Sequence, residues 1–300
     1  MTKIDYSRNA GLLDSSILTK STLSFIGCGG AANLIENLAG VGVGRINIVE
    51  FDTVSKTNPA TQGYGFDDIG KSKTQALEAR IKSKNPVTEV NLYNKRYEEL
   101  SLDEHAEIWK ANIVFAMTDS FPAQALINKD ALKNNTDAIF AICYIGCEAI
   151  EITGTFISEI VSGVGCHRCH TKARYDSYKK GFENPKNIPS HLFAAEYLNA
   201  YLGILATSRL HMQKGSSLPI ANVARQFSAK PCIISRLGGP EYWAQNGEPF
   251  SNTPIDQLLF STKQYGLDTP SSWVCPDCGT KGVVEELENS KDGTTLCLSG

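Results

Sequence analysis

One segment of the chain combines acidic and basic residues whose order and spacing could serve chemistry. Glu50 and Asp52 follow the apolar run 46–49, and the segment ends on Lys71 and Lys73. Carboxylates can hold the hydroxyl groups of a ribose, and lysines can neutralise phosphates. The segment therefore predicts a nucleotide site, although no arginine lies between Asp52 and Lys73.

A glycine-rich turn lies ahead of this segment. Residues 27–32, with Gly27, Gly29 and Gly30, match the pattern Gly-x-Gly-x-x-Ala between an apolar strand and a helix. The glycines of such a turn let a ligand approach the backbone, and the helix N-terminus offers amide donors to an anion. The pattern alone is weak and could serve packing only. Glu50, at the end of the next strand, favours a ribose-bearing nucleotide.

Two further residues separate the possible nucleotides. Lys73 stands at the start of a predicted helix, and Asp119 follows a predicted strand at the edge where open α/β sheets bind ligands. A lysine and a Mg²⁺-binding carboxylate suit ATP, whereas hydride transfer by a nicotinamide nucleotide needs neither. Each residue also has a simpler explanation, since Lys73 could be a solvated lysine and Asp119 a helix N-cap.

The nine cysteines include a second set of candidate residues, the Cys-x-x-Cys pairs Cys166/Cys169 and Cys275/Cys278. The N-terminus has no apolar core long enough for a signal peptide, so we expect a cytoplasmic protein with reduced thiols. Paired thiols in that setting indicate a metal site rather than disulfides. The net charge of -3 argues against nucleic acid or a membrane surface as a partner. No run approaches the length of a membrane span.

The alternation of strands and helices predicts how these residues are positioned. Strands are expected at 23–26, 45–49, 90–93, 113–117 and 138–144, with helices at 31–39, 71–83 and 123–132. This order is typical of a doubly wound, mostly parallel sheet, which gathers the ends of its strands at one edge. The predicted fold is therefore α/β and Rossmann-like.

The C-terminal half has a different pattern. Residues 151–161 alternate in polarity and predict an antiparallel strand that extends the sheet. Residues 170–190 are polar and predict a loop, and residues 191–211 predict a long buried helix. Without a repeat or a linker, we expect one domain over 1–300, with a nucleotide-binding half at 1–150 and a metal-bearing half at 151–300.

Together these motifs resemble the ThiF/MoeB superfamily, the ATP-dependent activating enzymes of ubiquitin-like and sulfur-carrier proteins. The resemblance covers residues 6 to about 150. It rests on motifs in register at 6–8, 27–30, 40–42, 50–54, 58–62, 68–73, 85–86 and 118–119. It extends to the cysteine pairs, which in this family meet to hold one structural Zn²⁺, and it implies a crossover loop at 170–191. His167 and His170 would be bystanders.

The resemblance implies a reaction in which the C-terminal carboxylate of a small protein attacks the α-phosphorus of ATP. The products are an acyl-adenylate and pyrophosphate. The resemblance also implies that Glu50 holds the ribose hydroxyls. Besides the glycines of the turn, the residues implied to line the nucleotide pocket are Asp52, Asn58 and Gln62.

Three residues are implied to act in the reaction itself. Lys73 would contact the phosphates, and Asp119 would hold Mg²⁺. Arg8 matches an arginine that reaches into the active site of the partner subunit in homodimeric members. The resemblance therefore implies a homodimer whose two sites are completed across the subunit interface.

The chain departs from the family where relatives carry an arginine that contacts the triphosphate. Thr61 stands at that position. Arg8 and Lys73 could suffice, another basic residue could substitute, or the site could bind ATP without turning it over.

A second departure concerns the cysteine that many relatives use to form a thioester. The loop at 170–191 has none. Cys28 lies in the nucleotide turn, and Cys143 and Cys147 look like buried strand positions. We therefore expect activation without an enzyme thioester.

The leading hypothesis is adenylation of a ubiquitin-like or sulfur-carrier protein. Relatives that activate a peptide or small molecule, or that modify tRNA, are alternatives within the same chemistry, although the net charge disfavours tRNA. An ATP-binding pseudoenzyme that acts as a scaffold is an alternative from another class. A nicotinamide oxidoreductase would leave Lys73, Asp119 and the cysteine pairs without a role.

Overall fold

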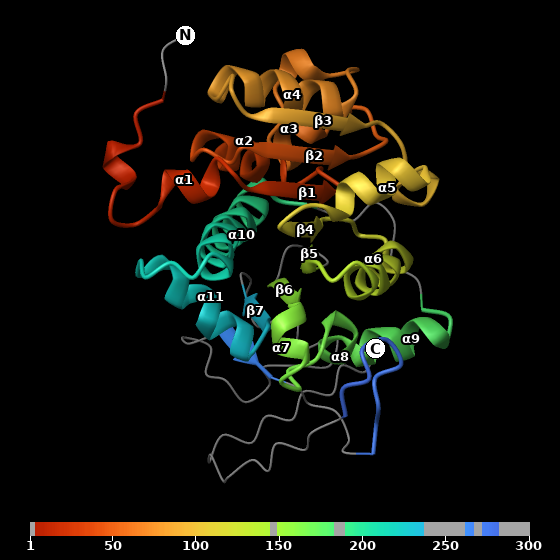
Figure 1. The fold of residues 1–300 in the computed structure, drawn as a ribbon. Helices are drawn as coiled ribbons and strands as arrows, with labels where there is room; N and C mark the ends of the chain where they lie inside the picture. The colour runs from red at the N-terminus through yellow and green to blue at the C-terminus, as the bar shows by residue number, and fades with distance from the viewer. Residues whose placement is uncertain (1–3, 145–148, 183–189, 237–261, 267–271, 282–300) are drawn as a thin grey trace.

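One mixed sheet organises the part of the chain that the structure describes. The computed structural model describes residues 4–144, 149–182, 190–236, 262–266 and 272–281. Within them the sheet has eight strands in the order β3-β2-β1-β4-β5-β6-β7-β8 (Figure 1). The parallel strands are β1 (Thr22–Ile26), β2 (Arg45–Val49), β3 (Glu89–Tyr93), β4 (Ile113–Ala116) and β5 (Asp137–Cys143). The strands that pair antiparallel beyond β5 are β6 (Ala149–Thr155), β7 (Cys232–Arg236) and β8 (Thr262–Tyr265).

Helices lie on both sides of this sheet (Figure 1). The longer ones are α2 (Ala32–Gly40), α4 (Lys73–Lys84), α5 (Leu102–Trp109), α6 (Phe121–Lys133), α9 (Lys172–Lys179), α10 (Leu192–Gln213) and α11 (Ile220–Ala229). Single turns are η1 (Ser7–Asn9), α1 (Ser15–Leu18), α3 (Asn58–Thr61), η2 (Phe66–Asp68), η3 (Tyr97–Glu99), α7 (Ile157–Ile160) and α8 (His167–His170). The predicted α/β class, with a mostly parallel sheet extended by antiparallel strands, is confirmed.

The two faces of the sheet are covered because successive side chains of a strand point to opposite faces. In β1, Phe25 packs in the core that contains buried residues of α2, α4 and α10. Its neighbour Ile26 packs in a second core with residues of α5 and α6. The ring of Phe25 stacks on that of Phe115 in β4, with 4.7 Å between centroids. The helices packed on the two faces of the sheet therefore fix the position of the strands.

The carboxyl ends of the parallel strands form the rim on which the site is built. The chain leaves β1 through Gly27, whose φ is +82°. A Cβ atom there would lie 2.6 Å from the backbone oxygen of Met117, which follows β4. Only glycine fits so close to the neighbouring strand, and this brings the turns after β1 and β4 together.

Two predictions for the C-terminal half are wrong in detail. The strand predicted over 151–161 ends at Thr155, and α7 begins at Ile157. A Cβ atom on Gly154 would lie 2.4 Å from the ring of Phe156, which folds back against the strand end. Alternating polarity alone therefore did not indicate where the strand stops.

The second error is the loop predicted over 170–190, which contains α9. This helix packs Tyr175 and Tyr178 against Phe121 of α6, with ring centroids 4.7 and 4.5 Å apart. Its Arg174 also forms an ion pair with Glu151 of β6 at 2.6 Å. Tertiary contacts of polar and aromatic residues stabilise α9, so its sequence carries no apolar periodicity to reveal it.

Helix α4 begins two residues later than predicted because of its cap. The Ser72 hydroxyl accepts a hydrogen bond from the backbone N–H of Gln75, so Ser72 precedes the helix and Lys73 is its first residue. Helices α5 and α11 were not predicted as separate elements. Both are short, at eight and ten residues, and each buries only a few side chains.

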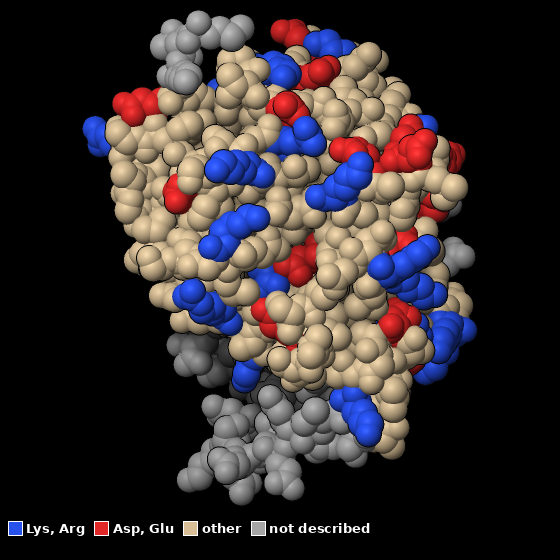
Figure 2. All heavy atoms as spheres, viewed as in Figure 1, with Lys and Arg blue, Asp and Glu red and all other residues tan. Residues whose placement is uncertain are grey.

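The surface carries both signs of charge. On the face that Figure 2 shows, Lys and Arg side chains are interspersed with Asp and Glu rather than gathered apart from them. Among the described residues, no helix combines the length and apolar character that crossing a membrane requires.

Candidate functional site

A pocket of about 400 Å³ opens at the rim of the parallel strands. The glycine turn after β1, the acidic residues after β2 and the turn after β4 all line it. The predicted site residues that the pocket brings together are Gly27, Gly29, Gly30, Glu50, Asp52, Gln62, Lys73 and Asp119. Asn58 and Arg8 are not among the residues that line it.

The Glu50 carboxylate is fixed by backbone amides. One oxygen accepts a hydrogen bond from the N–H of Cys28 at 3.0 Å, and the other accepts from Phe51 and Asp52 at 2.9 and 3.1 Å. Glu50 is buried to 6% exposure, so its orientation is set before any ligand arrives. It joins the glycine turn to the end of β2 and presents a preorganised acceptor beside that turn.

Lys73 reaches back from the start of α4 to the acidic residues. Its ammonium lies 3.1 Å from a carboxylate oxygen of Asp52, and its backbone N–H donates to the Asp52 carbonyl at 3.0 Å. The Lys73 side chain is 6% exposed, whereas that of Asp52 is 49% exposed. The lysine is therefore held rigidly with its charged end at the pocket, partnered by a carboxylate that faces solvent.

The loop that carries Thr61 and Gln62 covers the glycine turn. A Cβ atom on Gly29 would lie 3.0 Å from the Gln62 amide, so the second glycine makes room for this side chain. The Thr61 hydroxyl donates at 3.0 Å to the carbonyl of Thr57, the residue that precedes α3. Thr61, which stands where the family resemblance implies an arginine, thus lines the pocket with a hydroxyl bonded to the backbone carbonyl of Thr57. Asn58 shapes the same loop, because its side-chain oxygen accepts from the Ser55 N–H at 2.8 Å.

Arg80 of α4 forms hydrogen bonds that fix the position of this loop. Its guanidinium donates to the carbonyl of Gly63 at 2.8 Å and to the carboxylate of Glu36 at 2.9 Å, and it also contacts the side-chain oxygen of Asn33. Gly63 has a φ of +75°, a conformation that suits glycine. Sequence reasoning missed Arg80, because nothing in the spacing along the chain shows which loop a helix residue touches.

Sequence reasoning also missed the residues after β3. Lys95, Arg96 and Tyr97 line the pocket, as does His191 ahead of α10. The Lys95 ammonium donates to both carboxylate oxygens of Glu104, at 2.9 and 3.0 Å. A basic pair directly after a predicted parallel strand was the available signal, because the end of that strand lies on the same rim.

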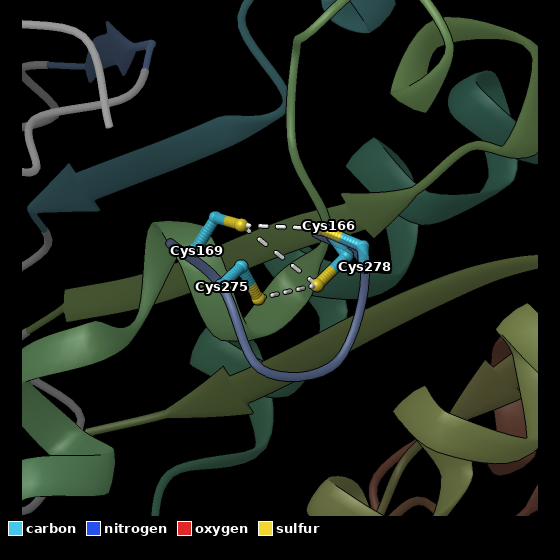
Figure 3. A group of neighbouring side chains, drawn as sticks. All are labelled: Cys166, Cys169, Cys275 and Cys278. Atoms are coloured by element: carbon cyan, nitrogen blue, oxygen red, sulfur yellow. Dashed lines mark hydrogen bonds between the residues drawn. The ribbon is translucent and has the colours of Figure 1, made fainter. Parts of the chain in front are cut away.

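The four cysteines of the two pairs meet, although more than a hundred residues separate the pairs along the chain. Figure 3 shows the four side chains converging from two segments. The sulfur atoms lie 3.9 Å apart in Cys166/Cys169, 3.8 Å in Cys166/Cys275 and 3.5 Å in Cys169/Cys278. Four thiolates about 2.3 Å from a tetrahedral Zn²⁺ would stand about 3.8 Å apart. The cluster therefore has the dimensions of a closed four-sulfur metal site.

Neighbouring side chains tie the second cysteine pair to the rest of the fold. Asp277 forms an ion pair with Arg168 of α8 at 2.7 Å and accepts from Asn128 of α6 at 3.0 Å. Asn128 also donates to the sulfur of Cys166 at 3.5 Å. Hydrogen bonds from Cys166 hold the pKa of the Cys278 thiol well below its usual value. Hydrogen bonds within the cluster also raise the pKa of the Cys166 and Cys169 thiols, so the four thiols form one hydrogen-bonded network.

His167 and His170 lie beside the cluster but outside the group of four ligands. The His167 ring stacks on Phe140, with 3.9 Å between centroids, and its Nδ1 is 2.6 Å from the Thr153 hydroxyl. Burial lowers the pKa of His167 well below its usual value and that of His170 to about 4. Both rings are therefore neutral near pH 7.

The cysteines outside the cluster differ in access. Cys28 and Cys232 are buried, and burial raises the pKa of both thiols. The prediction that Cys143 is buried is wrong, because it ends β5 on the pocket wall and is exposed. The first five residues of β5 are buried, and exposure increases over its last two, Ile142 and Cys143, which line the pocket. Cys147 and Cys297 lie outside the described residues.

A mostly parallel α/β sheet with a glycine turn, an adjacent fixed carboxylate and a buried lysine at one pocket defines the class of Rossmann-like nucleotide-binding folds. Within that class, the chain belongs to the ThiF family, whose model matches residues 6–229.

Named relatives are similar over part of their length. A sulfur carrier protein adenylyltransferase from Thermus thermophilus is 28% identical over 130 residues, which are 42% of this chain and 47% of that protein. The probable adenylyltransferase/sulfurtransferase MoeZ from Mycobacterium tuberculosis is 32% identical over 147 residues, 46% of this chain and 37% of MoeZ. The chain thus spans less than half of the length of these curated relatives.

A solved structure shows the same fold over most of the chain. The crystal structure of E. coli MccB with ATP has a TM-score of 0.60 at 18% identity and covers 88% of this chain and 68% of that one. At this identity the similarity concerns the fold alone.

Proposed function

We propose that this protein catalyses the ATP-dependent adenylation of the C-terminal carboxylate of a ubiquitin-like or sulfur-carrier protein. One observation carries the proposal: the glycine turn, Glu50, Lys73 and Asp119 line a single pocket on the rim of the sheet. The names of the Thermus and Mycobacterium relatives, which are adenylyltransferases, support the same chemistry. An oxidoreductase is disfavoured, because hydride transfer would leave Lys73 and Asp119 at the pocket without a role.

In the proposed reaction the residues of this chain bind and orient. Glu50 accepts hydrogen bonds from the ribose hydroxyls, and the glycine turn places its amides against the phosphates. A carboxylate oxygen of the carrier forms a bond to the α-phosphorus, and the bond from that phosphorus to the bridging oxygen breaks. Pyrophosphate leaves, and Lys73 stabilises the negative charge on the phosphates.

The residues at the rim also suit Mg²⁺. Asp119 lines the pocket after β4, and one carboxylate together with phosphate oxygens is a usual ligand set for this ion. Mg²⁺, when bound there, would supply neutralisation of phosphate charge. Asp119 is the residue that would hold it.

We further propose that no enzyme thioester forms. Cys28 and Cys232 are buried thiols with raised pKa values, so neither offers a thiolate to an acyl-adenylate. Cys143 is exposed at the pocket and is the described cysteine that an experiment must exclude. The acyl-adenylate would then leave the enzyme for a separate acceptor.

Two assembly features complete the proposal. Four sulfur atoms at tetrahedral spacing support a structural Zn²⁺ held by Cys166, Cys169, Cys275 and Cys278. Arg8 lies in η1, outside the residues that line the pocket. In a homodimer Arg8 would instead reach the pocket of the partner subunit and supply the charge that Thr61 lacks.

A pseudoenzyme is the second candidate, because Thr61 occupies the position of the phosphate-binding arginine. Exchange of pyrophosphate into ATP separates the two candidates. With Mg²⁺ and small carrier proteins that end in Gly-Gly, the enzyme should show carrier-dependent exchange, and Asp119→Ala should abolish it. Carriers that lack the terminal glycines are the matched control. Binding of ATP without exchange for any carrier would favour the scaffold, and exchange with a short peptide alone would favour a peptide-activating relative.

A further inference from the structure

One buried residue of helix α10 contacts the glycine turn and has no role in the proposed reaction. Asn199 is 5% exposed and is not among the residues that line the pocket. Its side-chain Nδ2 donates a hydrogen bond at 2.9 Å to the backbone carbonyl of Gly30. A Cβ atom on Gly30 would also lie 3.7 Å from the Cβ of Ala195 in the same helix. Helix α10 therefore packs directly against the turn and forms a hydrogen bond with it.

The neighbours of Asn199 determine which way its amide group faces. Its Nδ2 also lies 3.3 Å from a carboxylate oxygen of Glu196, three residues earlier in α10. A carbonyl and a carboxylate are both acceptors, so the side-chain atom that faces them must be the donor nitrogen. Glu196 is itself fixed by Asn33 of α2, whose side-chain amide donates to it at 2.7 Å. The hydrogen bond to Gly30 is thus part of a network that joins α10, α2 and the turn.

The same network reaches the loop that carries Thr61 and Gln62. The side-chain oxygen of Asn33 contacts the guanidinium of Arg80, which donates to the carbonyl of Gly63. The glycine turn and this loop line the same pocket. Polar side chains of α2, α4 and α10 therefore fix both segments relative to each other.

The side-chain oxygen of Asn199 has no comparable contact. It is buried and has no hydrogen-bond partner among the described residues. A buried oxygen without a partner is unfavourable for folding, and an apolar side chain of similar shape would avoid that cost. The contact of Asn199 with the turn therefore explains this residue better than stability does.

The hydrogen bond to the Gly30 carbonyl fixes the orientation of a backbone segment that carries free donors. The atoms of a peptide group share one plane, so holding the carbonyl holds the plane between Gly30 and Ala31. Gly29 and Gly30 line the pocket, and within the described part of the chain their N–H groups have no acceptor. Donors that are oriented before a charged group arrives stabilise it without the cost of reorganisation.

We propose that Asn199 is a positioning residue that orients the amides of the glycine turn toward the phosphates of the bound nucleotide. This inference rests on the proposed function, since it requires a nucleotide whose phosphates lie at the turn. It assigns to Asn199 an effect on the phosphates and none on the nucleoside part of the ligand.

Calorimetric titration with adenosine and with ATP and Mg²⁺ tests the assignment, because only ATP brings phosphates to the turn. Asn199→Ala should weaken ATP on the order of tenfold, the scale of one hydrogen bond to a charged group, and should leave adenosine within about twofold. Asn199→Leu is close in shape and has no polar side-chain atom. It should lose a similar factor for ATP while its thermal midpoint stays at or above that of Asn199→Ala, which separates affinity from stability.

Thr207→Val is the matched control on the same helix. The buried Thr207 hydroxyl donates at 2.9 Å to the carbonyl of Gly203 within α10, away from the turn. Its removal should change the affinity for either ligand by less than about twofold. A thermal melt of each variant verifies that it is folded.

Two results would overturn the assignment. Equal losses for adenosine and ATP would mean that Asn199 supports the pocket as a whole. Unchanged ATP affinity in both Asn199 variants would mean that the turn keeps its orientation without this residue. Wild-type protein that binds ATP no more tightly than adenosine would overturn the proposed function, and this inference with it.

Discussion

At the scale of single residues, the most consequential feature is the ion pair between Lys73 and Asp52. The residue types and the rim position were predictable from the sequence, because acidic residues after one strand and a lysine at a helix start are local features. Their pairing was not, since it depends on Ser72 ending the loop where it does. The same holds for Glu50, whose three amide partners come from the glycine turn and from its own loop.

Lys73→Ala should lower the rate of pyrophosphate exchange by about 10²-fold, the usual scale for removing one preorganised charge at a transferring phosphoryl group. Asp52→Asn is the matched partner variant. It frees the lysine without removing it, so exchange should fall much less than in Lys73→Ala. Initial rates at saturating ATP and carrier measure both. Equal losses in the two variants would mean that the ion pair, rather than the lysine, is what the site requires.

The exposed position of Cys143 makes the absence of a thioester a sharper prediction than the sequence allowed. After reaction with ATP and a carrier, a non-reducing gel should show no adduct that thiols cleave. Cys143→Ser should then retain exchange within about twofold, because this side chain is exposed and serine differs from cysteine only in the replacement of sulfur by oxygen. A thiol-sensitive band that disappears in Cys143→Ser would place the acyl transfer on this cysteine.

At the scale of elements, the parallel strands were predictable from the sequence. The contacts between distant segments that stabilise the surrounding elements were not. The end of β1 at Gly27 and the start of α4 at Ser72 have local signals. Helix α9 has none, because Tyr175 and Arg174 stabilise it through partners in α6 and β6. The hydrogen bond from Arg80 to the carbonyl of Gly63 was not predictable for the same reason. Contacts between distant segments decide these elements, and a single sequence does not display them.

The cysteine cluster joins α8 to the segment 272–281, so the metal should stabilise both elements. Elemental analysis should find about one zinc per chain, and Cys275→Ser should lower the zinc content and the thermal midpoint. Loss of a structural zinc should cost several kcal/mol. His170→Gln is the control, since this ring lies outside the four sulfur ligands and its loss should leave the zinc content unchanged. Metal-free wild-type protein of unchanged stability would rule out the site.

At the scale of the whole molecule, the sequence predicted the sheet class but not how the pocket is completed. Thr61 stands where the family resemblance implies an arginine, so that position carries no positive charge. Among the described residues, the pocket of one chain contains no substitute at that position. Lys95 is neutralised within the chain, and Arg96 lies on the far side of Glu50. Arg8 is therefore the residue whose contribution would require a second copy of the chain.

Mixing two inactive variants tests whether the site spans two chains. If Arg8 of one chain serves the pocket of the other, Arg8→Ala and Asp119→Ala should each have little exchange activity alone. A dimer of one Arg8→Ala chain and one Asp119→Ala chain has one pocket with both native residues. Because half of randomly reassorted dimers are mixed, unfolding and refolding the two variants together should restore about a quarter of wild-type exchange. Light scattering should also give twice the chain mass of 32.6 kDa. No recovery in verified mixed dimers, or full activity in a monomer, would place Arg8 outside the site.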